Sequence, residues 1–137
     1  MLVLDTGPIV ALLDADDVDH ARCVRMIEQQ QEGLLVPSPV LVEVDYWVRK
    51  RLGVPAWRIF VEDLTQGAYR LEHPLVTDLE RAAELESRYR DLRLGLVDAS
   101  VIAICERLGE EKVATLDRRH FSVVRPRHCP ALRLLPE

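Results

Sequence analysis

The sequence predicts an α/β fold in which helices cover both faces of a parallel sheet. Short apolar runs alternate along the chain with longer segments of helical periodicity. The apolar runs have the length and composition of strands buried on both faces, which is typical of parallel sheets. The 137 residues contain no internal repeat, low-complexity tract or linker, so we expect a single domain spanning residues 1–137.

The first third of the chain predicts two strands and two helices. Residues 2–4 form an apolar strand, and a helix at residues 8–13 has a proline early in its first turn, where proline is tolerated. An acidic loop follows, and then a helix at residues 20–31 that stops near a glycine. The apolar residues 34–36 form the next strand. This order is the strand-helix-strand pattern that parallel pairing requires.

The rest of the chain continues the alternation. Helices are expected at residues 39–52, 57–66, 78–90 and 96–108, and strands at residues 69–72, 113–116 and 132–135. The helix at residues 39–52 begins at a proline and has apolar residues at helical spacing: Val40, Val44, Trp47, Val48 and Leu52. The helix at residues 96–108 is apolar nearly all round, so we expect it to be buried at the centre of the molecule.

Bulk composition excludes several classes of protein. The net charge is −5, so nucleic acid can be bound only by a local cluster of basic residues. No apolar run approaches the ~18 residues of a membrane span, and we expect no membrane association. The three cysteines are odd in number and lack the CxxC spacing of a zinc site. This usage argues against a disulfide framework and favours the reducing cytoplasm.

Two acidic side chains follow strands at the edge where parallel sheets bind ligands. Asp5 comes directly after the strand at residues 2–4, and Asp117 directly after the strand at residues 113–116. Ligands in such sheets bind beyond the carboxyl ends of the strands. Thr115 lies two residues before Asp117 and so on the same side of the strand. A turn role would account for Asp117 alone, but the two acids together indicate a site.

Two further acids lie on helices that are otherwise apolar. Asp98 shares a helix face with Val101, where an ionised carboxylate costs several kcal/mol unless a cation or several donors meet it. Capping of the helix N-terminus is the alternative role for Asp98. Glu43 and Asp45 flank the apolar stripe of the helix at residues 39–52, and periodicity does not choose between them.

Together these acids predict a divalent metal site. Asp5, Glu43, Asp98 and Asp117 are expected at one sheet edge, where like charges raise one another's pKa values unless a cation neutralises them. A ligand set of oxygens alone selects a hard divalent ion, Mg²⁺ or Mn²⁺. Such an ion activates water and stabilises charge in an in-line phosphoryl displacement.

The same acids belong to four sequence segments that make the chain resemble a known family. The segments are Leu4-Asp5-Thr6 with Ala11-Leu12-Leu13, Pro39-Val40-Leu41-Val42-Glu43, Leu94-Gly95-Leu96-Val97-Asp98-Ala99 with Ala103, and Ala114-Thr115-Leu116-Asp117-Arg118-Arg119-His120-Phe121. In this order and at these intervals, they resemble the PIN-domain ribonucleases, and among them the VapC-type toxins of bacterial toxin–antitoxin pairs. The resemblance covers essentially the whole chain.

The resemblance implies a three-layer α/β/α sandwich and a Mg²⁺- or Mn²⁺-dependent endoribonuclease that acts as a toxin. Its substrate would be a structured RNA, either tRNA or large-subunit rRNA. A homodimer and a VapB-like antitoxin partner are also implied, and the two proteins would form a hetero-oligomer.

The family's site residues carry over onto six positions of this chain. The acids are Asp5, Glu43, Asp98 and Asp117, and the assisting hydroxyls are Thr6 and Thr115. By the same resemblance, Asp5 and Asp98 would be the main metal ligands, and the other two acids would complete the site directly or through water. Gly7 stands where such toxins more often have serine.

Contacts with RNA phosphates would depend on local basic clusters. The candidates are Arg49, Lys50 and Arg51 at the end of a helix, and Arg118 and Arg119 after Asp117. A solvated helix end is the alternative interpretation of the first cluster. His120 is as consistent with a structural role as with a functional one. Trp47 and Trp57 are expected in the core or in a dimer interface.

Other functions fit parts of the pattern. Asp5-Thr6-Gly7 matches the triplet of aspartic proteases, but those enzymes are almost wholly β and the triplet leaves Asp98 unexplained. A receiver-like domain would need a lysine near the last strand and paired acids early in the chain, and neither is present. A PIN nuclease that processes RNA without being a toxin, and a non-catalytic PIN-like module that binds RNA or protein, stay open.

Overall fold

The computed structural model describes residues Met1–Glu137 and contains one five-stranded sheet. The strands are β1 (Leu2–Leu4), β2 (Leu34–Pro37), β3 (Arg70–Glu72), β4 (Lys112–Ala114) and β5 (Arg133–Leu135). Their order across the sheet is β3-β2-β1-β4-β5, and every neighbouring pair is parallel. β1 is therefore the central strand, and Val3 pairs with Leu35 on one side and with Val113 on the other.

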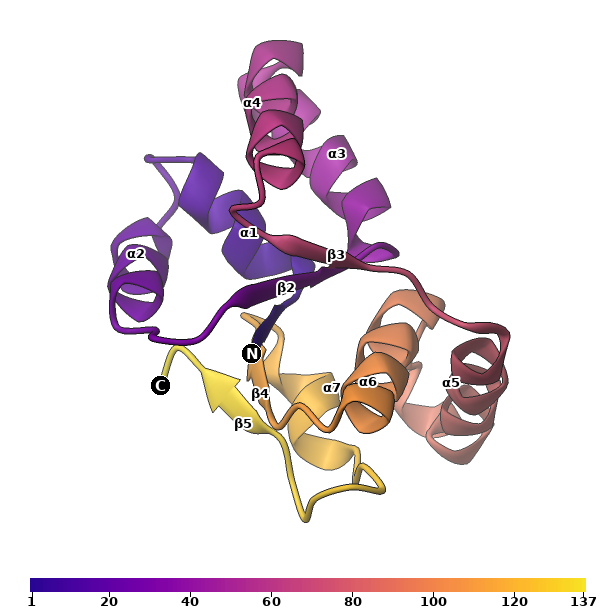
Figure 1. The fold of residues 1–137 in the computed structure, drawn as a ribbon. Coiled ribbons are helices and arrows are strands. Elements are labelled where there is room, and N and C mark those ends of the chain that lie inside the picture. Colours follow the sequence, from indigo (N-terminus) through magenta and orange to yellow (C-terminus); the bar gives the residue numbers. More distant parts are fainter.

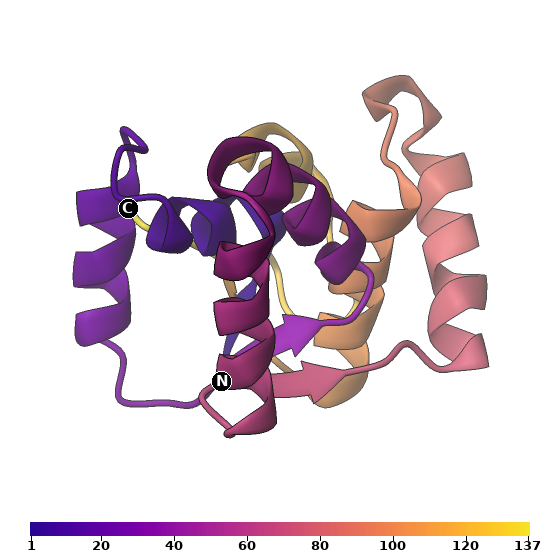
Figure 2. The same cartoon turned by 90° about the horizontal axis from the view of Figure 1, so that it is seen from above.

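Helices cover both faces of the sheet, so the predicted α/β/α layering is confirmed (Figure 1). One face carries α1 (Thr6–Leu13), α2 (His20–Glu28), α3 (Val40–Leu52) and α4 (Val54–Thr65). The other carries α5 (Val76–Arg88), α6 (Leu96–Leu108) and α7 (Arg118–Val123), with a short 3-10 helix, η1 (Arg90–Leu92), between α5 and α6. Seen from above, α5 lies outside α6 (Figure 2). None of the helices combines the length and the apolar character that spanning a bilayer requires.

The core forms around β1 and α6. All three residues of β1 are fully buried, which explains why this strand is an unbroken apolar run rather than an alternating one. α6 is buried from Ala99 to Cys105, as its apolar pattern predicted. The expected strands and long helices are all present, with ends that differ from the prediction by up to three residues.

The segment after β4 differs from the prediction in two ways. β4 ends at Ala114 rather than at residue 116, so Thr115 belongs to the loop that follows the strand. The residues after Asp117, for which the sequence predicted no element, form the short helix α7. Phe121 explains this helix, because it is 1% exposed and packs in the core cluster. A helix of six residues is too short to show a helical period in the sequence.

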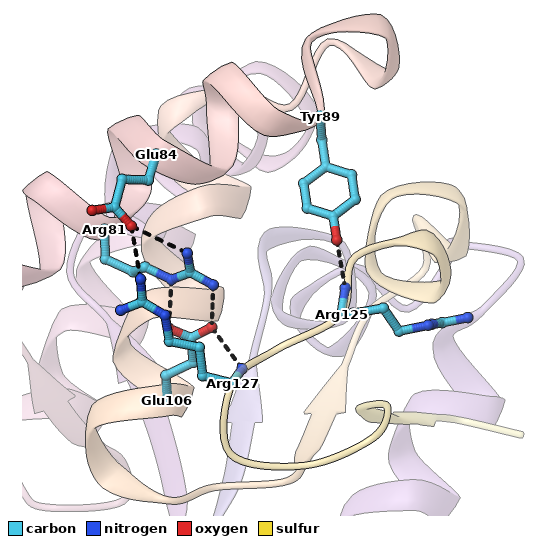
Figure 3. Close-up of polar contacts among 6 residues, drawn as sticks. All are labelled: Arg81, Glu84, Tyr89, Glu106, Arg125 and Arg127. Atoms are coloured by element: carbon cyan, nitrogen blue, oxygen red, sulfur yellow. Dashed lines mark hydrogen bonds and ion pairs between the residues drawn. The ribbon is translucent and has the colours of Figure 1, made fainter.

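A polar network fixes α5 and the C-terminal loop against α6 (Figure 3). Arg81 of α5 donates two hydrogen bonds, of 2.8 and 3.0 Å, to the carboxylate of Glu106 on α6. Arg127, in the loop between α7 and β5, donates its backbone N–H to the same carboxylate and its guanidinium to Glu84 of α5. Charged side chains thereby join the two helices and the loop near the C-terminal end of α6.

Candidate functional site

A cleft of about 690 Å³ opens beyond the carboxyl ends of the neighbouring strands β1 and β4. Six acidic side chains line it, and four of them are the predicted ones: Asp5 after β1, Glu43 on α3, Asp98 on α6 and Asp117 before α7. The structure thus brings together the acids that the sequence indicated at one sheet edge. A second hollow, of about 540 Å³ between α2 and β5, contains none of them.

Asp5 is the buried acid of this cleft. It is 5% exposed, and its Oδ2 accepts a 2.8 Å hydrogen bond from the Thr115 hydroxyl. The pKa of Asp5 is raised to about 6, chiefly by burial and then by the charges of Asp98 and Glu43, while hydrogen bonds such as that from Thr115 oppose the shift. A cation in the cleft would favour the ionised form and offset the cost of burying it.

One hydroxyl connects Asp5 with the loop that carries Asp117. The Oγ1 of Thr115 donates to Asp5 and accepts the backbone N–H of Asp117 at 3.1 Å. Thr115 is 1% exposed, so its hydroxyl bonds to these partners instead of to solvent. Because β4 has already ended at Ala114, the loop places this side chain rather than the alternation of a strand.

A second hydroxyl holds Glu43. Thr6, the first residue of α1, donates a 2.8 Å hydrogen bond to Oε1 of Glu43. This contact distinguishes Glu43 from Asp45, the other acid that the helical period allowed. Asp45 instead pairs with Arg49 at 2.8 Å and lies outside the cleft lining. Asp91, in η1, lies outside the lining as well.

Asp98, Asp117 and His120 form a compact group within the same cleft. Nδ1 of His120 lies 2.5 Å from Oδ2 of Asp98 and 3.6 Å from Oδ2 of Asp117. Burial raises the pKa of Asp98, His120 opposes the shift, and Asp117 adds to it. The capping role considered for Asp98 is wrong, because Gly95 occupies the N-cap of α6 and no side chain caps the helix.

Several residues of the cleft gave no clear signal in the sequence. The place of His120 depends on α7, which the sequence did not reveal. Asp17 and Asp19 come from the acidic loop before α2. Trp47 is not a core residue, since it is 39% exposed and lines the cleft. Its position one helical turn after Glu43 was the signal that could have found it.

Of the basic residues considered for RNA contact, only Arg51 lines the cleft. Its guanidinium binds Asp17 at 2.8 Å and lies 5.6 Å from the centroid of the Trp47 ring. The others lie outside the lining: Arg49 pairs with Asp45, Lys50 lies over the rings of Tyr46 and Trp47, Arg118 donates to the carbonyl of Pro136, and Arg119 is exposed on α7.

The donor set of the cleft suits a divalent ion. Carboxylate oxygens are ligands that Mg²⁺ and Mn²⁺ prefer, and Asp98, Asp117 and His120 offer ligand atoms within 4.8 Å of one another. Asp5 adds a buried carboxylate whose ionised form needs a compensating charge. The aspartic-protease alternative does not fit, because Asp5 lies between a parallel strand and a helix of an α/β fold.

Known proteins share this fold. Residues 2–125 match the model of the PIN domain. Ribonuclease VapC26 of Mycobacterium tuberculosis is 35% identical over 125 residues, which cover 91% of this chain and 93% of that protein. The crystal structure of M. tuberculosis VapC20, described as a toxin that cleaves the sarcin–ricin loop, matches with a TM-score of 0.77 and 23% identity over 82% of this chain and 87% of that one.

A toxin–antitoxin complex from Klebsiella pneumoniae contains a similar chain. The TM-score is 0.70 at 16% identity, and the match covers 90% of this chain and 92% of the other. The agreement of the sequence match with the parallel sheet and its layers leads to one conclusion. The chain belongs to the PIN-domain family and, within it, to the VapC-type proteins.

Proposed function

We propose that the protein is a divalent-metal-dependent endoribonuclease and the toxin of a type II toxin–antitoxin pair. The observation that carries the proposal is the cleft in which Asp5, Glu43, Asp98 and Asp117 converge, with Asp5 only 5% exposed. Negative charges gathered in one cleft oppose one another's ionisation unless a cation is present. The 35% identity to a ribonuclease supports RNA as the substrate class.

In this proposal Asp5 and Asp98 are the main ligands of Mg²⁺ or Mn²⁺, and Glu43 and Asp117 contact the ion directly or through water. When bound, such an ion polarises a phosphoryl oxygen and lowers the pKa of water, which provides a nucleophile at neutral pH. The hydroxyl of Thr115 and that of Thr6 hold acids of the site in place before substrate arrives. A carboxylate fixed in this way is positioned to accept a proton from the attacking water.

The basic residues around the cleft would bind the RNA backbone. Arg51 is placed best, because it already lies on the cleft wall, where a phosphate could replace Asp17 as its partner. Phosphates farther along the RNA chain would contact the other basic candidates, which are Arg49, Lys50, Arg118 and Arg119. The structural likeness to VapC20, a sarcin–ricin loop cleaving toxin, supports a structured loop of large-subunit rRNA, and a tRNA loop is the second candidate substrate.

A VapB-like antitoxin and a second copy of this chain are the proposed protein partners. Several apolar side chains of α3 and α4 are exposed, among them Val42 at 74%, Val54 at 53% and Ile59 at 55%. Exposed apolar side chains on adjoining helices support a surface that another protein covers. The relative from Klebsiella pneumoniae is itself a toxin–antitoxin complex, which supports an antitoxin partner.

Cleavage of total cellular RNA by purified, antitoxin-free protein tests the enzymatic proposal. We expect cutting with Mg²⁺ or Mn²⁺ and none in EDTA. Asp98→Asn should lower the cleavage rate at least about 10- to 100-fold, because it removes a proposed ligand. Asp91→Asn is the matched control: it changes the same residue type outside the cleft lining and should cleave like the wild type.

Two results would contradict the proposal: cutting that persists in EDTA, or cutting by Asp98→Asn at the wild-type rate. If neither result is found, sequencing the ends of the cleaved RNAs would identify the substrate. Ends within a single loop of large-subunit rRNA would support the first substrate candidate, and ends within tRNA loops the second.

A further inference from the structure

His120 directs one ring nitrogen into the space between two acids of the cleft. Its Nδ1 lies 2.5 Å from Oδ2 of Asp98 and 3.6 Å from Oδ2 of Asp117. Each of the three side chains places a ligand atom within 4.8 Å of the others. The imidazole is 18% exposed, so it is enclosed by the protein rather than free at the surface.

The short helix α7 builds this arrangement. Asp117 occupies the N-cap of α7 and His120 lies in its first turn, so both side chains face the same end of the helix. Phe121 follows directly and is 1% exposed, which anchors α7 in the core. The direction of the imidazole is therefore set by packing.

A hydrogen bond to Asp98 accounts for the shorter contact, whereas the 3.6 Å separation from Oδ2 of Asp117 is too long for a second one. Nδ1 carries at most one proton, and one N–H cannot serve two separate carboxylates well. In the other neutral tautomer the proton lies on Nε2, and the lone pair of Nδ1 points between the two acids. A neutral imidazole nitrogen flanked by carboxylate oxygens is a metal-ligand set.

We propose that Nδ1 of His120 is a ligand of the divalent ion, beside Asp98 and Asp117, and that this nitrogen makes the site prefer Mn²⁺ to Mg²⁺. The inference rests on the proposed function, because it concerns the ion that this function requires. Mg²⁺ is bound almost entirely by oxygen, whereas the divalent ions of the first transition row accept imidazole as well. Neighbouring ligand atoms of an octahedral ion lie about 3 Å apart. Nδ1 of His120 and Oδ2 of Asp98, now 2.5 Å apart, therefore need to move only slightly farther apart to bind the same ion.

Electron spin echo spectroscopy of the Mn²⁺-loaded protein tests this ligand without measuring activity. A coordinated imidazole nitrogen modulates the echo of bound Mn²⁺. We expect this modulation in the wild type, and we expect it to change to the nitrogen-15 pattern when only the histidines carry that isotope. It should vanish in His120→Asn and stay in His73→Asn, the matched control, since His73 is exposed in the connection between β3 and α5.

Calorimetric titration with each ion gives an independent readout. The asparagine of His120→Asn keeps an N–H donor near the position of Nδ1, so it can preserve a hydrogen bond to Asp98 but has no imidazole lone pair. We expect its affinity for Mn²⁺ to fall about 10- to 100-fold, and its affinity for Mg²⁺ to change much less. A purely structural role for His120 would leave both affinities close to those of the wild type.

Two results would overturn the role of His120: a wild-type Mn²⁺ complex without nitrogen modulation, or equal losses of affinity for the two ions. The proposed function would survive either result if the wild type cleaves RNA with Mg²⁺ and Asp98→Asn does not. A folded wild type that binds neither ion would overturn both proposals. The wild-type spectrum decides the question even if circular dichroism shows that His120→Asn is unfolded.

Discussion

Asp5 shows at the scale of one residue how the site opposes the stability of the fold. Its carboxylate is 5% exposed, and its pKa is raised from 3.8 to about 6. The folded protein therefore binds this proton more tightly than the unfolded chain does. As the pH rises through this interval, the contribution of Asp5 to stability falls, and above pH 6 the buried charge destabilises the metal-free protein.

Asp5→Asn should raise the free energy of unfolding of the metal-free protein at pH 8. The amide retains an oxygen for the hydrogen bond from Thr115 but carries no charge. A rise of the pKa from 3.8 to about 6 corresponds to about 3 kcal/mol, so we expect a gain of about 1 to 3 kcal/mol. The gain should shrink as the pH falls towards 4, where the wild-type carboxyl is itself protonated. Urea denaturation in EDTA at both pH values measures it.

Asp117→Asn is the control for this experiment. The Asp117 side chain is 54% exposed, so removal of its charge should change stability much less. A variant Asp5→Asn that is less stable than the wild type at pH 8 would show that the carboxylate is compensated within the protein itself.

The sequence pattern indicated Asp5, Asp98 and Asp117 because each follows an apolar strand or interrupts an apolar helix, whereas the choice of Glu43 over Asp45 rested on the family resemblance. His120 and Trp47 could not be assigned in the same way. The direction of the His120 side chain depends on α7 and its buried Phe121, and that of Trp47 on how α3 meets the cleft. Such directions come from packing between segments that are distant in the sequence.

At the scale of elements, α6 carries Asp98 in its first turn and is fixed by charged side chains towards its other end. The side chains of Arg81 and Glu106 are 12% and 9% exposed, so their pair is largely removed from solvent. Burial alone would raise the pKa of Glu106, but hydrogen bonds from Arg81 and Arg127 hold it below its ordinary value of 4.5. The network therefore stabilises the ionised form of Glu106.

Glu106→Gln should lower the free energy of unfolding at pH 7 by about 2 to 3 kcal/mol, because the Arg81 guanidinium loses its charged partner. The folded-state pKa of Glu106 is depressed, so its stabilising contribution is present above its ordinary pKa and is lost as the pH falls through the folded-state value. The difference between the wild type and the variant should accordingly shrink in acid. Urea denaturation at neutral and acidic pH measures this difference.

Glu137→Gln is the matched control, because it removes an ion pair with Arg133 in which the side chains are 71% and 64% exposed. An exposed pair of this kind contributes less than about 1 kcal/mol. Equal effects of the two substitutions would mean that the partial burial of the Arg81–Glu106 pair adds nothing to its contribution.

The elements themselves differ in how well the sequence predicted them. The bounds of α6 were predicted to the residue, because thirteen residues with an all-round apolar pattern give a strong signal. The six-residue helix α7 was missed, and β4 was predicted too long because Thr115 and Leu116 continue its apolar pattern into the loop. The hydrophobic period of the sequence identifies long elements but does not identify elements of only a few residues.

At the scale of the whole molecule, the exposed apolar side chains of α3 and α4 support the proposed protein partners. Expression of the chain alone should arrest bacterial growth, and co-expression of a VapB-like antitoxin that covers the toxin should restore it. Growth curves with and without the antitoxin measure the effect. Asp98→Asn should express without arrest, because it keeps the apolar face and loses a proposed metal ligand. Normal growth together with RNA cleavage in vitro would assign the protein to RNA processing instead of to a toxin role.

The general rule for ligand sites in parallel sheets was sufficient to predict the edge of the sheet that carries the cleft. It could not predict the order of the strands. The order β3-β2-β1-β4-β5 makes β1 and β4 neighbours, and only this pairing allows the Thr115 hydroxyl to reach Asp5. Strand order depends on how the helices between the strands pack, and that information is not local in the sequence.

The hydrogen bond between Thr115 and Asp5 joins residues that are 110 positions apart, and this separation has a consequence during protein synthesis. Asp5 leaves the ribosome long before β4, α7 and Asp117 are made. A nascent chain therefore lacks a neighbour of its central strand and one of the four proposed site acids until the segment from β4 to α7 has been made. The order of synthesis thus delays the assembly of the cleft that we propose cuts RNA.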